Sequence, residues 1–431
     1  MTHRLLALLL LGMAGAAAPA LGASDSEARL CHDIKLEPPF RVEACARALA
    51  ASDLTKRQQL DLLTARAAAL DQLGDYARAI ADYDSAIVLA PDDAVLHLNR
   101  GVAKIHDGRP ADAIEDYGKA IHLKPDWHLP YFDRAVALGD LGQRAAALKD
   151  YERAIQRKPD DAWIYVGQGD VLAASGDPLR AIAAYDKALA LRPELDDPRA
   201  KRAELLLRLD RPAEALPELD RVVAGNPSKP GIWHARGEAK FQLARYAEAA
   251  EDLRRALDLA PRDKGVRRAL ARAELGAGDS EDAWRTMSLA LGASENEATD
   301  LSLAAMVALL TNRMSAAEGL VRRAIDIKPG EGTAQAILAL YLRRQGDADG
   351  AREAAALAAT FAPGDAEIAA VAKLAGAELD PAATPAPATP ASPAQQALAD
   401  CVADLRAGDL AAAGAAAAGW SLCHLAAVLA Q

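Results

Sequence analysis

The four cysteines of this sequence have side chains with well-defined chemistry, and they form two local pairs. Cys31 lies 14 residues before Cys45, and Cys401 lies 22 residues before Cys423. An even number of cysteines in an exported chain is typical of disulfide bonds. One cysteine of each pair is followed directly by a histidine, which raises the alternative of zinc binding. Neither pair has the two-residue spacing of zinc ligands, so we predict two disulfides and no metal site.

Motifs for catalysis and cofactor binding are missing from the sequence. It contains no Walker loop, dinucleotide-binding glycine fingerprint, His-Glu-x-x-His run or Gly-x-Ser-x-Gly sequence, and no Cys-x-x-Cys-His run for haem attachment. We therefore expect no catalytic residues, no cofactor and no enzymatic activity. An active site assembled from distant parts of the chain stays open as an alternative, because motif spacing does not reveal such a site.

The composition narrows the class of protein further. The chain has 431 residues, of which 50 are Lys or Arg and 61 are Asp or Glu, giving a net charge of −11. An acidic chain lacks the basic surface that neutralises nucleic-acid phosphates. Hydrophobic residues make up 51% and charged residues 26%, which excludes wholesale disorder and a multi-span membrane protein. Only 4% of residues are aromatic, so we expect helices that pack closely through small side chains.

Residues 1–23 have the pattern of a secretory signal peptide. Arg4 precedes an apolar run of 14 residues over 5–18, and small residues follow up to Ala23. The run is short for a membrane span. Ser24 stands where a lipoprotein would have its cysteine. We predict cleavage near residues 20–23 and a periplasmic or secreted protein that is not a lipoprotein; an amphipathic helix is disfavoured because the run has no polar face.

A period of 34 residues organises most of the chain. Prolines stand at 91, 125, 159, 193, 227, 261, 329 and 363, and every interval is 34 except one of 68. Such a period predicts an array of identical units of supersecondary structure. Ending each unit two residues after its proline gives nine repeats: 60–93, 94–127, 128–161, 162–195, 196–229, 230–263, 264–297, 298–331 and 332–365.

Each repeat has the features of two helices joined by a tight turn. Position 8 is small in every repeat, position 20 is always alanine, position 27 is alanine in eight repeats, and position 24 is large and apolar in eight. Glycine at position 15 is suited to ending the first helix, and proline at position 17 to starting the second. The glycines are Gly74, Gly108, Gly142, Gly176, Gly278 and Gly346, and the prolines are Pro110, Pro178 and Pro212.

These columns resemble the tetratricopeptide repeat (TPR), over about 306 of the 431 residues. The resemblance implies an all-α, right-handed α-solenoid of nine helix hairpins, with a concave groove lined by the first helix of each repeat. Repeats of this family bind proteins and peptides. Repeat seven departs from the pattern, because it lacks the proline and has Glu274 between its helices, and repeat nine has Ala355 in place of a bulky residue.

Two further columns vary together. Repeats one, two, three, five and six have arginine at position 7 and an acidic residue at position 23, whereas the other four repeats lack both. We infer that the two columns touch and form structural ion pairs that set the helix register. A row of ligand-binding arginines is the weaker alternative. The pairs are Arg66 with Asp82, Arg100 with Asp116, Arg134 with Asp150, Arg202 with Glu218, and Arg236 with Asp252.

The ends of the array differ from the repeats. Residues 24–59 are expected to form a half-repeat cap stapled by a Cys31–Cys45 disulfide, with the segment around Cys31 replacing its first helix. A terminal capping helix is expected at 366–377, a Pro/Ala-rich linker at 378–394, and a C-terminal helical hairpin at 395–431. The hairpin is uncharged from residue 410 onward, so it can dock on the array, bind a second chain or associate with a membrane as a tail.

The expected groove is apolar in repeats two to four. In this family the groove-facing side chains come from first-helix positions 2, 5, 9 and 12. The predicted partner-binding residues are Val95, Leu98, Asn99, Val102, Ile105, Leu129, Phe132, Val136, Trp163 and Val166. An apolar surface of this kind marks a binding site for a peptide or helix, unless neighbouring repeats or the C-terminal hairpin cover it. Only Asn99 matches the carboxylate-gripping residues of chaperone-binding relatives, so we do not expect that specificity.

The sequence thus favours an exported scaffold that mediates protein–protein interaction through its concave groove. The expected partner is a protein or peptide of the cell envelope, with no nucleic acid, no small-molecule substrate and at most weak membrane association through the C-terminal tail. Two alternatives remain. The chain is a self-associating or tail-anchored envelope assembly factor, or it is the substrate-recruiting arm of an enzyme complex.

Overall fold

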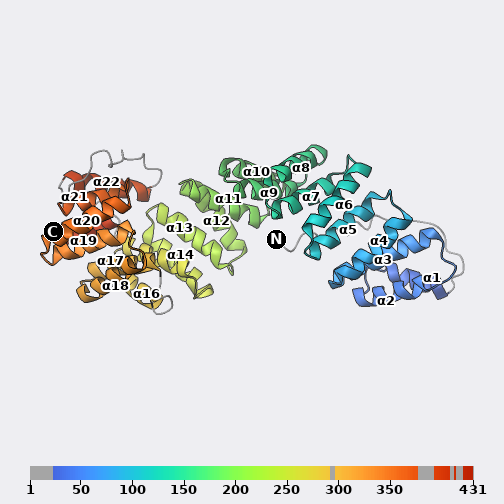
Figure 1. The fold of residues 1–431 in the computed structure, drawn as a ribbon, viewed down its shortest axis with the longest axis horizontal. Helices are drawn as coiled ribbons and strands as arrows, with labels where there is room; N and C mark the ends of the chain where they lie inside the picture. Colours follow the sequence, from blue (N-terminus) through green and yellow to red (C-terminus); the bar gives the residue numbers. More distant parts are fainter. Residues whose placement is uncertain (1–22, 292–296, 377–392, 408–411, 414–420, 431) are drawn as a thin grey trace. The chain divides into compact units, whose positions relative to one another are not determined.

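A computed structural model describes residues 23–291, 297–376, 393–407, 412–413 and 421–430 (Figure 1). Across these residues every regular element is an α-helix, which confirms the predicted all-α class. The chain divides into two compact units, one ending at Leu195 and the other beginning at Asp196. The predicted signal peptide and nearly all of the predicted linker at 378–394 lie outside the described residues.

The first unit contains a helical cap and repeats one to four. Successive helices pack as neighbours, and the first helix of each repeat also contacts the first helix of the next (Figure 1). Its helices are α1 (Ala23–His32), α2 (Pro38–Leu49), α3 (Lys56–Leu73), α4 (Tyr76–Leu89), α5 (Ala94–His106), α6 (Pro110–Leu123), α7 (His128–Asp140), α8 (Arg144–Arg157), α9 (Ala162–Ala174) and α10 (Pro178–Leu191).

The second unit contains repeats five to nine and the C-terminal helices. The repeats comprise α11 (Asp196–Arg208), α12 (Pro212–Gly225), α13 (Pro230–Gln242), α14 (Tyr246–Leu259), α15 (Lys264–Gly276), α16 (Ser280–Leu291), α17 (Ala298–Leu310), α18 (Met314–Ile327), α19 (Gly332–Arg344) and α20 (Ala348–Phe361). After them come α21 (Ala366–Leu374), α22 (Pro393–Ala407) and α24 (Leu422–Ala430).

All nine turns within the repeats require a left-handed backbone at position 15. The six glycines of that column have φ between 73° and 88°. In the other three repeats Asp210, Ala244 and Asn312 occupy the position with φ of 55–58°. Pro110, Pro178 and Pro212 each start the second helix of their repeat, as predicted. The turn conformation is therefore a property of the repeat and not of glycine alone.

Small residues at position 8 let the two helices of a repeat lie close together. A Cβ atom on Gly101 would stand 2.6 Å from the ring of Tyr117, and one on Gly169 would stand 2.6 Å from the ring of Tyr185. In repeat six the same relation holds between Gly237 and Leu253, at 2.7 Å. The bulky residue at position 24 therefore fills the space that the small residue leaves, and a larger side chain at position 8 would push the helices apart.

A disulfide-linked helix pair forms the N-terminal cap. Cys31 of α1 and Cys45 of α2 are bonded, and both helices pack on α3. The segment around Cys31 is thus a helix in its own right, because residues 23–32 wind regularly before the turn that precedes α2. Buried Arg41 donates a hydrogen bond from Nη1 to Gln72 Oε1 at 3.1 Å. This contact joins the cap to the first repeat.

The second predicted disulfide is also formed, between Cys401 of α22 and Cys423 of α24. These two helices belong to the predicted C-terminal hairpin, whose turn at 408–409 lies outside the described residues. Among the helices that the structure describes, none combines the length and the apolar character that crossing a membrane requires.

The left-handed turn residues give a stability prediction. Ala244→Gly should raise the free energy of unfolding by about 1 kcal/mol, because a Cβ atom is strained at φ 58°. The matched control is Gly278→Ala, at the same position of the next repeat with φ 88° and open space around the new Cβ, and it should lower stability by a similar amount. Chemical denaturation followed by circular dichroism measures both, and equal signs for the two changes would contradict the assignment.

Candidate protein-binding face

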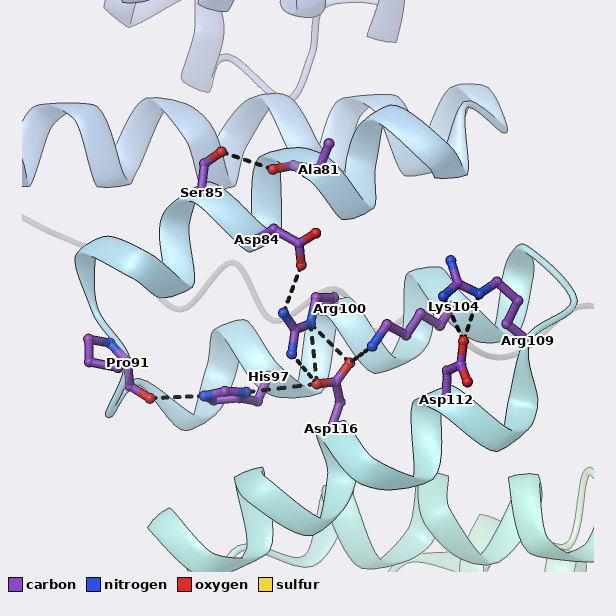
Figure 2. Close-up of polar contacts among 10 residues, drawn as sticks. All are labelled: Ala81, Asp84, Ser85, Pro91, His97, Arg100, Lys104, Arg109, Asp112 and Asp116. Carbon is purple, nitrogen blue, oxygen red and sulfur yellow. Dashed lines mark hydrogen bonds and ion pairs between the residues drawn. The ribbon is translucent and has the colours of Figure 1, made fainter.

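Buried ion pairs hold the first helices of the repeats in register. In repeat two, Asp116 of α6 is 1% exposed and accepts contacts from two cations of α5 (Figure 2). Arg100 Nη2 lies 2.5 Å and Lys104 Nζ 2.7 Å from its carboxylate oxygens. Arg100 also reaches back to Asp84 of the preceding repeat, at 2.7 Å. A single arginine thus links both helices of its repeat to the repeat before it.

The same contact recurs at each of the five predicted pairs. Arg66 lies 2.7 Å from Asp82, Arg134 lies 2.6 Å from Asp150, Arg236 lies 2.6 Å from Asp252, and Arg202 lies 3.3 Å from Glu218. Repeat six copies repeat two in full, because Lys240 is 2.8 Å from Asp252 and Arg236 also contacts Asp220 of the preceding repeat. The arginine column is therefore engaged within the scaffold, which favours the structural role over ligand binding.

Repeat seven replaces this pair with a different polar contact. Glu274, at position 11, is buried and accepts hydrogen bonds from Thr286 Oγ1 at 2.8 Å and from Arg254 Nη2 at 2.9 Å. Burial raises the pKa of Glu274, while the two hydrogen bonds oppose that shift. Position 11 is where repeats two and six have Lys104 and Lys240, so the polarity of the contact is reversed and the contact itself is kept.

The predicted groove residues lie along α5, α7 and α9, and most are half-buried. Leu98 and Val166 are buried, at 5% and 6% exposure, so these two do not face the solvent as the sequence suggested. They pack with alanines of their own and the following repeat. The remaining residues form what we term the apolar strip: Val95, Asn99, Val102, Ile105, Leu129, Phe132, Val136 and Trp163, all half-buried.

Asp133 is a polar group of this region that sequence reasoning did not assign. It lies on α7, is 9% exposed, and makes no hydrogen bond or ion pair among the described residues. Burial raises its pKa to about 7. The hydroxyl of Tyr117, close enough to feel the charge of Asp133, is also buried without a hydrogen-bond partner. The signal was its place at position 6, next to the apolar strip residue Phe132.

Further along the first unit, Asp170 of α9 carries a different contact. Its carboxylate accepts a hydrogen bond from the hydroxyl of Tyr185 at 2.7 Å. Nowhere in the described part of the chain do three or more His, Cys, Asp or Glu side chains gather in a way that could hold a metal ion.

Comparison with protein families gives the same repeat at the same places. Three tetratricopeptide repeat models match the chain, the first over residues 64–126 and 132–196, the second over 172–238 and the third over 230–263. The chain belongs to the tetratricopeptide repeat family. No curated protein matches it.

Solved TPR structures show likeness at low identity. The crystal structure of YrrB, described as a TPR protein with an unusual peptide-binding site, is 20% identical, with a TM-score of 0.40 over 44% of this chain and 95% of its own. A TPR protein from Parabacteroides merdae is 16% identical, with a TM-score of 0.44 over 57% and 97%. MamA from Desulfovibrio magneticus is 23% identical, with a TM-score of 0.38 over 39% and 95%.

The corresponding TPR positions are covered in the second unit. Helix α24 packs on the first helices α17 and α19 and on α21. Its residues share one apolar core with Met306 and Leu309 of α17 and with Ala336 and Leu340 of α19. These four residues occupy positions 5, 9 and 12 of repeats eight and nine, and all are buried. Where this face is covered, an apolar helix of the chain itself covers it.

The Asp116 contact predicts a large asymmetry between its two arginine-bound carboxylates. Asp116→Ala should lower the free energy of unfolding by about 3–5 kcal/mol, because it leaves two buried cations without their counter-charge. Asp84→Ala, which removes an exposed partner of the same arginine, should cost less than about 1 kcal/mol. Urea denaturation of both variants tests this, and similar losses would refute the scaffold role of Asp116.

The buried carboxyl of Asp133 predicts a pH-dependent effect. The folded protein keeps its proton up to about pH 7, whereas the unfolded chain loses it near pH ~4, so this residue lowers stability as pH rises between those values. Asp133→Asn should therefore gain stability relative to the parent as pH rises from 4 to 7, by at most about 4 kcal/mol. Denaturation midpoints at several pH values measure it. Asp150→Asn, at a paired carboxylate, should instead lose stability above pH 5.

Proposed function

We propose that this TPR protein is an exported scaffold that binds an apolar helix or peptide of another envelope protein along the apolar strip of α5, α7 and α9. The observation that carries the proposal is the contrast between the two units. In repeats eight and nine the corresponding positions are buried beneath α24, whereas in repeats two to four they are half-buried. Apolar surface that is left partly open at the same positions is typical of an interaction site.

The chemistry of the strip suggests what the partner presents to it. Val102, Leu129 and Val136 offer apolar contact, which suits a helix with side chains at spacings of three and four residues. Asp133 adds one carboxyl group without a described partner. A hydrogen-bond donor or cation on the partner would satisfy that group, and its burial makes an unpaired charge costly. The partner is therefore an apolar segment with one well-placed donor.

Export is supported by the cysteines. All four cysteines are in disulfides, and disulfides persist in oxidising compartments such as the bacterial periplasm. The signal-like pattern of residues 1–23 agrees with that location. Binding, and not catalysis, is the activity proposed, because TPR arrays act through surface complementarity.

Site-specific photo-crosslinking tests the binding face. A photoreactive amino acid at Val102 or Val136 should crosslink to a partner in the producing cells, because both side chains lie in the strip. Val88, on the second helix α4 and 81% exposed, provides the control position and should give no adduct. Val102→Glu should reduce adducts formed at Val136 at least tenfold, whereas Val88→Glu should leave them unchanged. Equal adducts at all three positions would refute the assignment of the face.

A further inference from the structure

The C-terminal helices form a module that is covalently closed on itself. The Cys401–Cys423 disulfide joins α22 to α24, and no disulfide joins either helix to the repeats. The main chain of residues 377–392 alone connects the module to the array. Those 16 residues are rich in proline and alanine, and an extended chain of that length reaches about 50 Å.

The module is seated on a surface with specific features. Leu425, Ala426 and Ala427 of α24 are fully buried against residues of α17, α19 and α21, among them Leu301, Ile337 and Val371. Small side chains on α24 allow this close approach. Helix α22 also contacts α13 and α21.

One carboxylate of the array caps the bound helix. Glu367 Oε1 accepts a hydrogen bond from the backbone N–H of Cys423 at 2.7 Å, in the first turn of α24. The first N–H groups of a helix have no partner within the helix, and a negative charge is favourable there. The surface thus recognises a helix N-terminus together with a stripe of small residues. No charged residue occurs between 410 and 431, so the interface is otherwise apolar.

We propose that two copies of this chain associate by exchanging these modules, so that α24 of each copy binds the α17–α19–α21 surface of the other. Every copy carries both the surface and a helix that fits it. The exchanged dimer has the same contacts as the monomer, so only the path of residues 377–392 distinguishes them. Reciprocal exchange also closes the assembly at two copies. The proposal uses a different surface from the apolar strip and stands independently of it.

Mixing two tagged full-length forms tests the exchange. An affinity-tagged copy and a fluorescent copy are incubated together at increasing concentration, and the fluorescence captured through the tag is measured over time. We expect co-capture that rises with concentration. Ala426→Glu in both copies should reduce it at least tenfold, because the glutamate would place a charge at a fully buried site of α24. Gln396→Glu, which adds the same charge at an exposed site of α22, should leave co-capture unchanged.

A second variant keeps the test independent of any folding defect in the first. Glu367→Ala removes the cap on α24 and weakens docking equally in the monomer and in the exchanged dimer. The dimer fraction should therefore stay nearly constant, while exchange becomes about fivefold faster, as expected for the loss of one helix cap. Circular dichroism checks that helicity is kept. Absence of co-capture at about 100 µM, co-capture that survives Ala426→Glu, or an exchange rate unaffected by Glu367→Ala would each overturn the proposal.

Discussion

The close approach of two helices within each repeat is the constraint on which the rest of the structure depends. At Gly101 and Gly169 there is no room for a Cβ atom, because a tyrosine ring of the second helix occupies that space. Close packing at this point fixes the distance between the helices. The buried arginine–aspartate contacts then fix their register, as Arg100 does by bonding Asp116 of its own repeat and Asp84 of the one before. The positions of the first-helix side chains follow from these two contacts.

The fold was largely predictable because its determinants repeat. One column of alanines, one of glycines and one of prolines, each at a period of 34, identify the helix hairpins without any structure. The arginine and acidic columns were predictable as pairs since they appear and disappear together. Lys104 was not, because a lysine at position 11 occurs in only some repeats and its distance to Asp116 depends on the crossing of two helices.

The binding face was predictable only in part, for a physical reason. Periodicity indicates which first-helix positions lie on one side, but exposure depends on how deeply the next repeat covers them. Leu98 is buried and Val102, one turn later, is half-buried, although both were assigned to the same face. Asp133 was missed because a lone aspartate gives no sign of burial. The docking of α24 on α17, α19 and α21 joins segments that are more than 50 residues apart, and no local pattern encodes it.

The shared turn conformation has a consequence for how such a chain can change in length. In all nine repeats the residue at position 15 is left-handed, whether it is glycine, aspartate, alanine or asparagine. Because every hairpin enters and leaves its turn in the same way, a gene duplication or deletion of one complete 34-residue unit would join equivalent backbone geometries. The array is thus built so that evolution can lengthen or shorten it one hairpin at a time.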